Sequence, residues 1–169
     1  HERVLLPAYT GRGQAPSRAL AFSPDGTMLA VGTDAGTIEI YAVGGGWDRL
    51  GSCQGGHTAP VVAIDWSEDG TELQTNSLHH EVVFWRASSA TQISASATRA
   101  VRWASANCKV SWSLKGAMGR QSHADALTAS ARTHQAAGAL ACGDATGTVS
   151  LLAYPALSAT AAERRYRAH

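Results

Sequence analysis

Residues 21–26 read AFSPDG and residues 65–70 read DWSEDG, so a short phrase with an aromatic residue, a serine and Asp-Gly recurs after 44 positions. The stretches around the two phrases, 17–43 and 60–87, share one order of features. Each contains an alternating apolar run, a Ser-x-Asp-Gly turn, a second run, a polar turn and a third run. A period within about 20–50 residues predicts a repeat architecture.

A weaker third copy covers residues 125–155, with Thr133-His134-Gln135 in place of the Asp-Gly turn. Apolar residues fill every second position of the runs, as Ile38 and Ile40 do, which is strand periodicity. Fourth strands are expected near 49–54 and 91–95. A meander of four strands per roughly 40–45 residues is typical of a β-propeller blade. The sequence therefore predicts an all-β fold, a partial propeller of about three four-stranded antiparallel blades.

About 25 further residues separate the second and third copies, and they contain two alternating runs, 100–103 and 108–114. We expect this insert to add strands that an ordinary blade lacks. Three blades do not close a ring, so we also expect further blades from a longer chain or another chain. The first residues lack Met and a signal segment, which favours the interior of a longer chain. The expected division is 1–16, last strand of a preceding blade and its connection; 17–57, a blade; 58–97, a blade; 98–122, atypical insert strands; 123–165, a blade; and 166–169, the start of the next blade.

Composition restricts the class of protein. Hydrophobic residues make up 44% of the 169 residues, enough for a packed core, and no apolar run approaches the roughly 20 residues of a membrane span. Cys53, Cys108 and Cys142 show no metal-ligand spacing, and their odd number favours a reducing, cytosolic compartment. Residues 1–90 carry five Arg against ten acidic residues, whereas 91–169 carry nine Lys and Arg against three. Such asymmetry guides a partner to one face or reflects a mixed, solvated surface.

The second copy resembles a WD repeat, because Gly56-His57 precedes its first strand and Trp85 closes its third. In that family a His, a Ser or Thr, an Asp and the Trp form a buried hydrogen-bonded set that locks the blade. The resemblance assigns His57, Thr75 and Trp85 to this set. His79 stands at the Asp position, so we expect the set to be incomplete.

Over nearly its full length the chain resembles the echinoderm microtubule-associated protein-like family. Thr98-Arg99 and Trp103-Ala104 in the insert, and Tyr154-Pro155 at the end of the third copy, carry the resemblance. It implies a segment of the second, C-terminal propeller of a non-enzymatic protein of the cytoplasm and cytoskeleton. It further implies tubulin or microtubules as partner, with a ciliary or axonemal setting as one possibility.

Signals for chemistry are weak. His57, Asp65 and Ser67 have the residue types of a hydrolase, but no GxSxG elbow is present and the repeat explains their positions. His79-His80-Glu81 has metal-capable side chains, yet neighbours on a strand face opposite ways. GAMGR at 116–120 lacks the Gly-Lys-Ser/Thr end of a phosphate loop. We therefore expect no catalytic residue, no cofactor and no metal.

Basic residues in or near the insert are the candidates for partner binding. They would meet an acidic microtubule surface through salt-sensitive attraction. No aromatic-basic recognition motif accompanies them, so we expect no nucleic acid. The alternative is a general protein-protein scaffold with a partner other than tubulin. Trp47, Trp103 and Trp112 are either buried or partner anchors. The candidates are Arg99, Arg102, Lys109, Lys115, Arg120 and Arg132, with a further terminal cluster at Arg164, Arg165 and Arg167.

Overall fold

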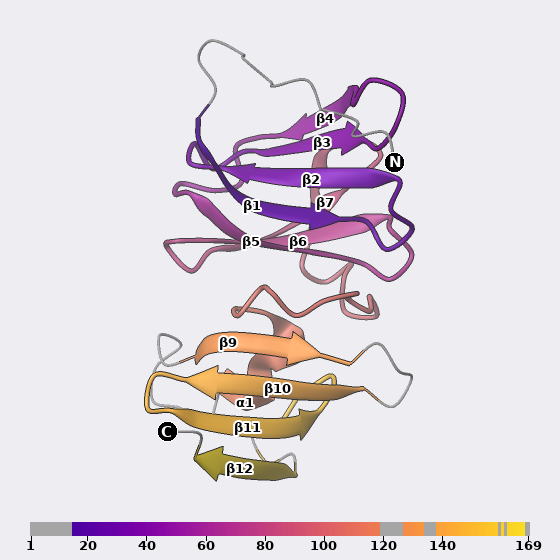
Figure 1. Cartoon of the computed structure of the whole chain (residues 1–169). Coiled ribbons are helices and arrows are strands. Elements are labelled where there is room, and N and C mark those ends of the chain that lie inside the picture. Colours follow the sequence, from indigo (N-terminus) through magenta and orange to yellow (C-terminus); the bar gives the residue numbers. More distant parts are fainter. Residues whose placement is uncertain (1–14, 119–126, 134–137, 159, 161, 168–169) are drawn as a thin grey trace, which may run out of the picture.

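The computed structural model describes residues 15–118, 127–133, 138–158, 160 and 162–167. Three four-stranded antiparallel sheets follow one another along the described chain, and neighbouring strands in each sheet are consecutive in sequence (Figure 1). This architecture confirms the predicted all-β fold with three four-stranded blades.

The strand bounds match the repeat pattern, and the expected fourth strands near 49–54 and 91–95 are present. The first sheet contains β1 (Ser17–Phe22), β2 (Met28–Thr33), β3 (Ile38–Ala42) and β4 (Arg49–Cys53). The second contains β5 (Val61–Trp66), β6 (Glu72–Ser77), β7 (Val82–Arg86) and β8 (Thr91–Ile93). The third contains β9 (Leu127–Arg132), β10 (Ala139–Asp144), β11 (Thr148–Ala153) and β12 (Glu163–Arg167).

The repeated Ser-x-Asp-Gly phrase forms the turn between the first two strands of a sheet. Ser23 donates to the Asp25 carboxylate at 2.6 Å, and that carboxylate accepts the backbone N–H of Thr27 at 3.0 Å. Gly26 has φ +71°, a left-handed conformation that glycine adopts without the usual Cβ penalty. The second phrase repeats these contacts, so the letters recur because the turn geometry recurs.

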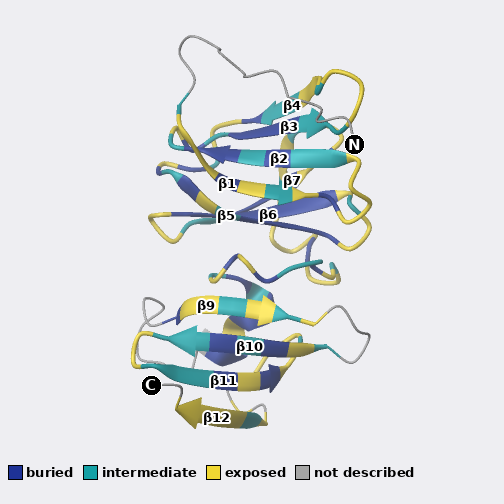
Figure 2. Ribbon diagram, viewed as in Figure 1, coloured by how far each residue is buried: buried dark blue, intermediate teal, exposed yellow. Residues whose placement is uncertain are grey.

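The first and second sheets pack face to face around one apolar core (Figure 2). Trp66 is 1% exposed, and its indole N–H donates across the interface to the Ala21 carbonyl at 2.9 Å. At Gly32 an added Cβ would lie 2.7 Å from a Val61 methyl carbon, so the two sheets meet at van der Waals distance. Burying an aromatic side chain of this size contributes roughly 2–3 kcal/mol. The aromatic residues of the two phrases differ in burial, because Phe22 is 57% exposed whereas Trp66 is buried.

The expectation of extra strands in the insert was wrong. Its described part contains one isolated bridge, between Ser67 and Trp103, followed by a 3-10 turn (Trp112–Leu114) and the single-turn helix α1 (Lys115–Met118). The alternating apolar positions do not mark a strand here. They mark a segment that buries side chains against the second sheet on one side and the third sheet on the other.

The expected end of the third blade also needs correction. β12 pairs with β11 through Arg167, so Tyr166 and Arg167 belong to the third sheet and not to a following blade. Three expected features lie wholly or partly outside the described residues: 168–169, residues 1–14 of the strand and connection expected at 1–16, and residues 134–135 of the turn at 133–135.

Exposed apolar side chains lie at both ends of the stack of sheets. Leu20 and Phe22 of the first sheet are 67% and 57% exposed. Leu151 and Tyr166 of the third sheet are 39% and 50% exposed. In a propeller, such faces are covered by neighbouring blades.

Candidate interaction surface

The residues assigned to the blade-locking set lie together at one end of the second sheet. Thr75 is fully buried, and its hydroxyl lies 2.7 Å from His57 Nε2 and 2.9 Å from Trp85 Nε1. It also donates to the Val83 carbonyl at 3.2 Å. The hydroxyl, on β6, therefore ties the loop residue His57 to two positions on the neighbouring strand β7.

The fourth member of this set is Glu81, not His79. The Glu81 carboxylate lies 3.3 Å from His57 Nδ1 and accepts hydrogen bonds from Ser77 at 2.6 Å and from the Thr58 backbone at 3.0 Å. These hydrogen bonds, from Ser77 first, lower the pKa of Glu81 to about 2. Burial lowers the pKa of His57, so the ring is neutral near pH 7. The longer Glu side chain reaches from a position two residues beyond the one expected.

Gly56 precedes His57 because no side chain fits there. An added Cβ would lie 2.5 Å from Trp85 Cη2 and 3.0 Å from a Val83 methyl carbon. The indole ring therefore packs directly on the backbone of the Gly-His pair, which explains why the two residues occur together.

The insert is attached to the second sheet by a buried carboxylate. Asp65 is fully buried on β5, and each of its oxygens accepts two hydrogen bonds. One oxygen accepts the Ser105 hydroxyl at 2.5 Å and the Asn107 N–H at 2.8 Å. The other accepts the Gln74 amide and the Cys108 N–H, both at 2.9 Å. Four donors satisfy a charge that would otherwise be costly to bury.

Two amide side chains of β6 continue this recognition of the insert. Asn76 donates to the Val110 carbonyl and accepts the Val110 N–H, both at 2.9 Å. Gln74 accepts the Ser111 hydroxyl at 3.0 Å. These contacts replace the backbone pairing of a strand, so the insert follows the sheet without forming a ladder.

The other side of the insert packs against the third sheet. The Ser113 carbonyl accepts the Ala156 N–H at 2.8 Å, and the Gly116 N–H donates to the Ala156 carbonyl at 2.5 Å. Leu114 is fully buried in the core cluster of the third sheet. The insert therefore joins the second and third blades.

The predicted basic residues do not form one patch. Arg102 and Arg132 both pair with the exposed carboxylate of Glu68, at 3.3 Å and 2.6 Å. The Arg132 side chain is only 2% exposed, bonds the Trp103 carbonyl and lies 4.7 Å from the centre of the Tyr154 ring. Arg132 therefore holds the third sheet to the insert and is not available to a partner.

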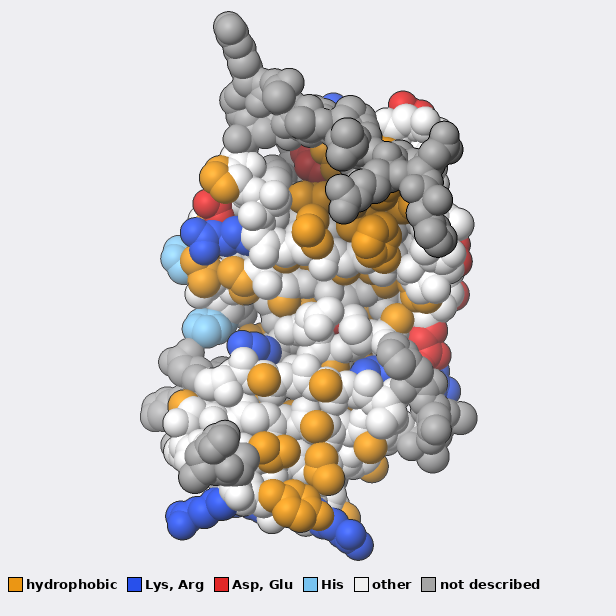
Figure 3. All heavy atoms as spheres, viewed as in Figure 1, with side chains coloured by type: hydrophobic (Ala, Val, Ile, Leu, Met, Phe, Trp, Pro, Cys, Tyr) orange, Lys and Arg blue, Asp and Glu red, His pale blue; other side chains and the backbone are white. Residues whose placement is uncertain are grey.

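Three other candidates, Arg99, Lys109 and Lys115, are exposed, and Arg120 lies outside the described residues. Lys109 lies beside the start of β5, whereas Arg102 contacts Glu68, which follows the end of that strand. On the face shown in Figure 3, basic side chains are scattered and do not gather in one field. Scattered cations of this kind can attract an acidic partner over a long range or contact it one at a time.

The three tryptophans outside the repeat positions differ in burial. Trp103 is fully buried, with 0% of its surface exposed, and it stacks on Phe84 with ring centres 5.9 Å apart. Trp47 and Trp112 are partly buried. Trp103 is thus part of the packing between the insert and the second sheet.

The side chains considered for chemistry serve structural contacts. His57 bonds Thr75, Asp65 holds the insert, and Ser67 donates to Asp69 at 2.6 Å in its turn. The part of the chain that the structure describes contains no group of three His, Cys, Asp or Glu side chains placed to hold a metal ion. Within those same residues, no helix has the length and apolar character to cross a membrane. Burial raises the pKa of all three cysteines, to about 12 for Cys53.

Comparison with known proteins identifies the family. The family model "Echinoderm microtubule-associated protein second beta-propeller" matches residues 8–169. Echinoderm microtubule-associated protein-like 2 of Rattus norvegicus is 34% identical over 99% of this chain, which covers 26% of that protein. The human protein of that name is 33% identical over 93% of this chain and 24% of its own length. The 77 kDa echinoderm microtubule-associated protein of Strongylocentrotus purpuratus is 35% identical over 89% of this chain and 22% of its own length.

The chain thus spans about a quarter of the length of these relatives. The family match extends from before the first described strand to the end of the sequence, and it includes the insert that joins the second and third blades. The chain belongs to the echinoderm microtubule-associated protein family, in the region of its second β-propeller.

Proposed function

We propose that this chain is a non-enzymatic interaction platform of a microtubule-associated protein and that it contributes to binding tubulin or the microtubule lattice. The protein would act in the cytoplasm on the cytoskeleton. Its mechanism is rigid presentation of loops and strand edges, with affinity from contacts spread over a broad surface.

Family membership is the observation that carries this proposal. The relatives that match over most of the chain are named as microtubule-associated proteins. The described side chains that could have suggested catalysis, His57, Asp65 and Ser67, are each occupied by structural hydrogen bonds. A rigid scaffold without a reaction centre fits these contacts.

The insert supplies exposed cations for an acidic partner. Lys109 and Lys115 are exposed and are the only two lysines in the sequence. Because Arg102 and Arg132 are paired with Glu68, the positive charge available to a partner is smaller than the sequence count implies. This internal pairing favours a second candidate, a general scaffold whose partner is not tubulin.

Co-sedimentation of the protein at its full natural length with microtubules tests the proposal. We expect binding that weakens with salt, because exposed charges are screened. The double variant Lys109→Glu/Lys115→Glu should bind less, and Arg49→Glu/Arg86→Glu, with the same change in charge on β4 and β7, is the control. Absence of co-sedimentation at low salt would contradict microtubule binding and favour the scaffold. Equal binding by both variants would remove the insert from the contact surface.

A further inference from the structure

Two hollows lie next to each other where the second sheet, the insert and the third sheet meet, and β1 of the first sheet also lines one of them. Each has a volume of about 390 Å³. The two hollows share four lining residues, and together we call them the junction groove. The shared residues are Val62, Ala63, Asn107 and Lys109.

The groove follows the edge of a strand. β9 is the end strand of the third sheet, and four consecutive residues of it, 127–130, line the two hollows. At about 3.3 Å per residue, this edge is about 13 Å long. Its unpaired backbone groups have the spacing that an extended peptide needs for main-chain hydrogen bonds. The shape therefore suits an extended segment of about four residues.

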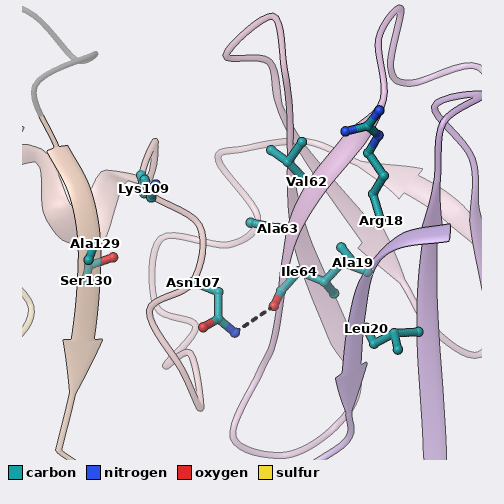
Figure 4. A pocket seen from close by; sticks show the side chains of 10 residues that line it. All are labelled: Arg18, Ala19, Leu20, Val62, Ala63, Ile64, Asn107, Lys109, Ala129 and Ser130. Carbon is teal, nitrogen blue, oxygen red and sulfur yellow. Dashed lines mark hydrogen bonds between the residues drawn. The ribbon is translucent and has the colours of Figure 1, made fainter.

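The charged side chains among the described lining residues, those of Lys and Arg, are positive. Lys109 of the insert and Arg18 of β1 stand on either side of the first hollow (Figure 4). Among the residues that the structure describes, no Asp or Glu lines either hollow. Asp34 pairs with Arg18 from outside the groove, whereas Lys109 has no ion pair with any residue that the structure describes. Lys109 is therefore the cation most available to an anionic ligand.

The second hollow adds an apolar contact. Leu78 and Val62 line it, and they are 51% and 39% exposed. Val110 of the insert lines the same hollow. Aliphatic side chains beside an unpaired cation fit a ligand that carries both an apolar side chain and a carboxylate.

We propose that the junction groove binds an extended acidic peptide segment of a partner protein, with carboxylates at Lys109 and an apolar side chain against Val62 and Leu78. The residues named for this site come from β1, the second sheet, the insert and β9 of this chain. The inference goes beyond the proposed function, because it holds whether or not the partner is tubulin.

Fluorescence polarisation of a short fluorescein-labelled peptide of Glu and Asp with one central Leu tests this site on the protein at its full natural length. The wild-type protein should bind it in a salt-dependent way. Lys109→Glu should weaken binding about tenfold or more, since an attraction becomes a repulsion. Lys115→Glu, the other lysine of the insert, should bind like the wild type. Leu78→Ser should weaken binding of this peptide but not of a peptide with Ser in place of Leu.

Three results would overturn the proposal: no binding by the wild type, equal binding by Lys109→Glu, or the same loss for Lys115→Glu. Circular dichroism of each variant shows whether its fold is retained. If the peptide does not bind while microtubules still co-sediment, the groove is wrong and the proposed function stands. If the peptide binds but microtubules do not, tubulin is excluded as the partner and the groove stands.

Discussion

Replacement of Asp65 by Asn should release the insert from the second sheet. Asp65 accepts two hydrogen bonds on each oxygen, and two of the four donors are the backbone N–H groups of Asn107 and Cys108. These N–H groups contact different oxygens. Whichever way an Asn amide turns, its NH₂ group faces one of them, so one buried N–H loses its acceptor.

The size of the effect follows from these contacts. A buried N–H without an acceptor costs about 1–3 kcal/mol. The other backbone N–H keeps an acceptor, but the neutral amide oxygen of Asn accepts a weaker hydrogen bond than a carboxylate does. We therefore expect Asp65→Asn to lower the free energy of unfolding by about 3 kcal/mol. If opening is local, amide hydrogen exchange in the insert should accelerate by about a hundredfold.

Hydrogen exchange with mass spectrometry measures this directly. Peptides that cover 102–114 should lose protection in Asp65→Asn, whereas peptides from β2 and β3 should change little. Asp48→Asn is the matched control, because Asp48 is exposed and its replacement removes the same charge. Unchanged protection of the insert in Asp65→Asn would refute the inference that this carboxylate holds it in place.

Three further predictions concern the blade-locking set. Gly56→Ala should destabilise the fold by about 2 kcal/mol, since its Cβ would lie 2.5 Å from Trp85. Gly46→Ala should not, because its Cβ would come no closer than 3.8 Å to the Asp48 carboxylate, and urea unfolding compares the two variants. Thr75→Val should cost about 2 kcal/mol in the same assay, because two buried ring nitrogens lose a partner. Folding lowers the pKa of His57 below 6.5, so the unfolded chain binds the additional proton and stability should fall as the pH drops below 6.5. His57→Gln should lack this part of the pH dependence in urea midpoints measured between about pH 7.5 and 5.5, and an unchanged profile would contradict the assignment.

The repeat made most of the fold predictable. Apolar alternation and the Ser-x-Asp-Gly turns depend on contacts within one blade, so they appear directly in the sequence. The fourth strands were found because the period is regular. The bounds of β12 were missed, because its last residues, Tyr166 and Arg167, stand where the resemblance expects a new repeat.

The insert was misjudged for a physical reason. Its alternating apolar side chains are buried against the second sheet or the third sheet. In sequence this pattern is the same as that of a β-strand, and only the positions of the two sheets distinguish them. Its backbone is satisfied by side chains of β5 and β6, and sequence spacing does not reveal a contact such as Asp65 with Cys108 across 43 positions. In the sequence, Asp65 was considered only as a catalytic residue. The available signal for its structural role was an acidic residue at a position of a strand that should be buried.

The candidate contact residues were only partly predictable. Counting Lys and Arg in the insert does not show which are paired, and Glu68 pairs with two of them. Likewise, Glu81 replaces the expected acidic residue of the blade-locking set because its longer side chain reaches from another position. Distances between side chains, not residue types, separate free from occupied charges.

Zero-length cross-linking of microtubule-bound protein at its full natural length tests the central claim most directly. A carbodiimide joins a lysine amine to a carboxylate in contact with it, and this chain has lysines only at 109 and 115, both exposed in the insert. If the chain meets the acidic surface of tubulin through its insert, mass spectrometry should find tubulin carboxylates linked to Lys109 or Lys115. Bound protein whose tubulin cross-links all come from outside this chain would contradict the account.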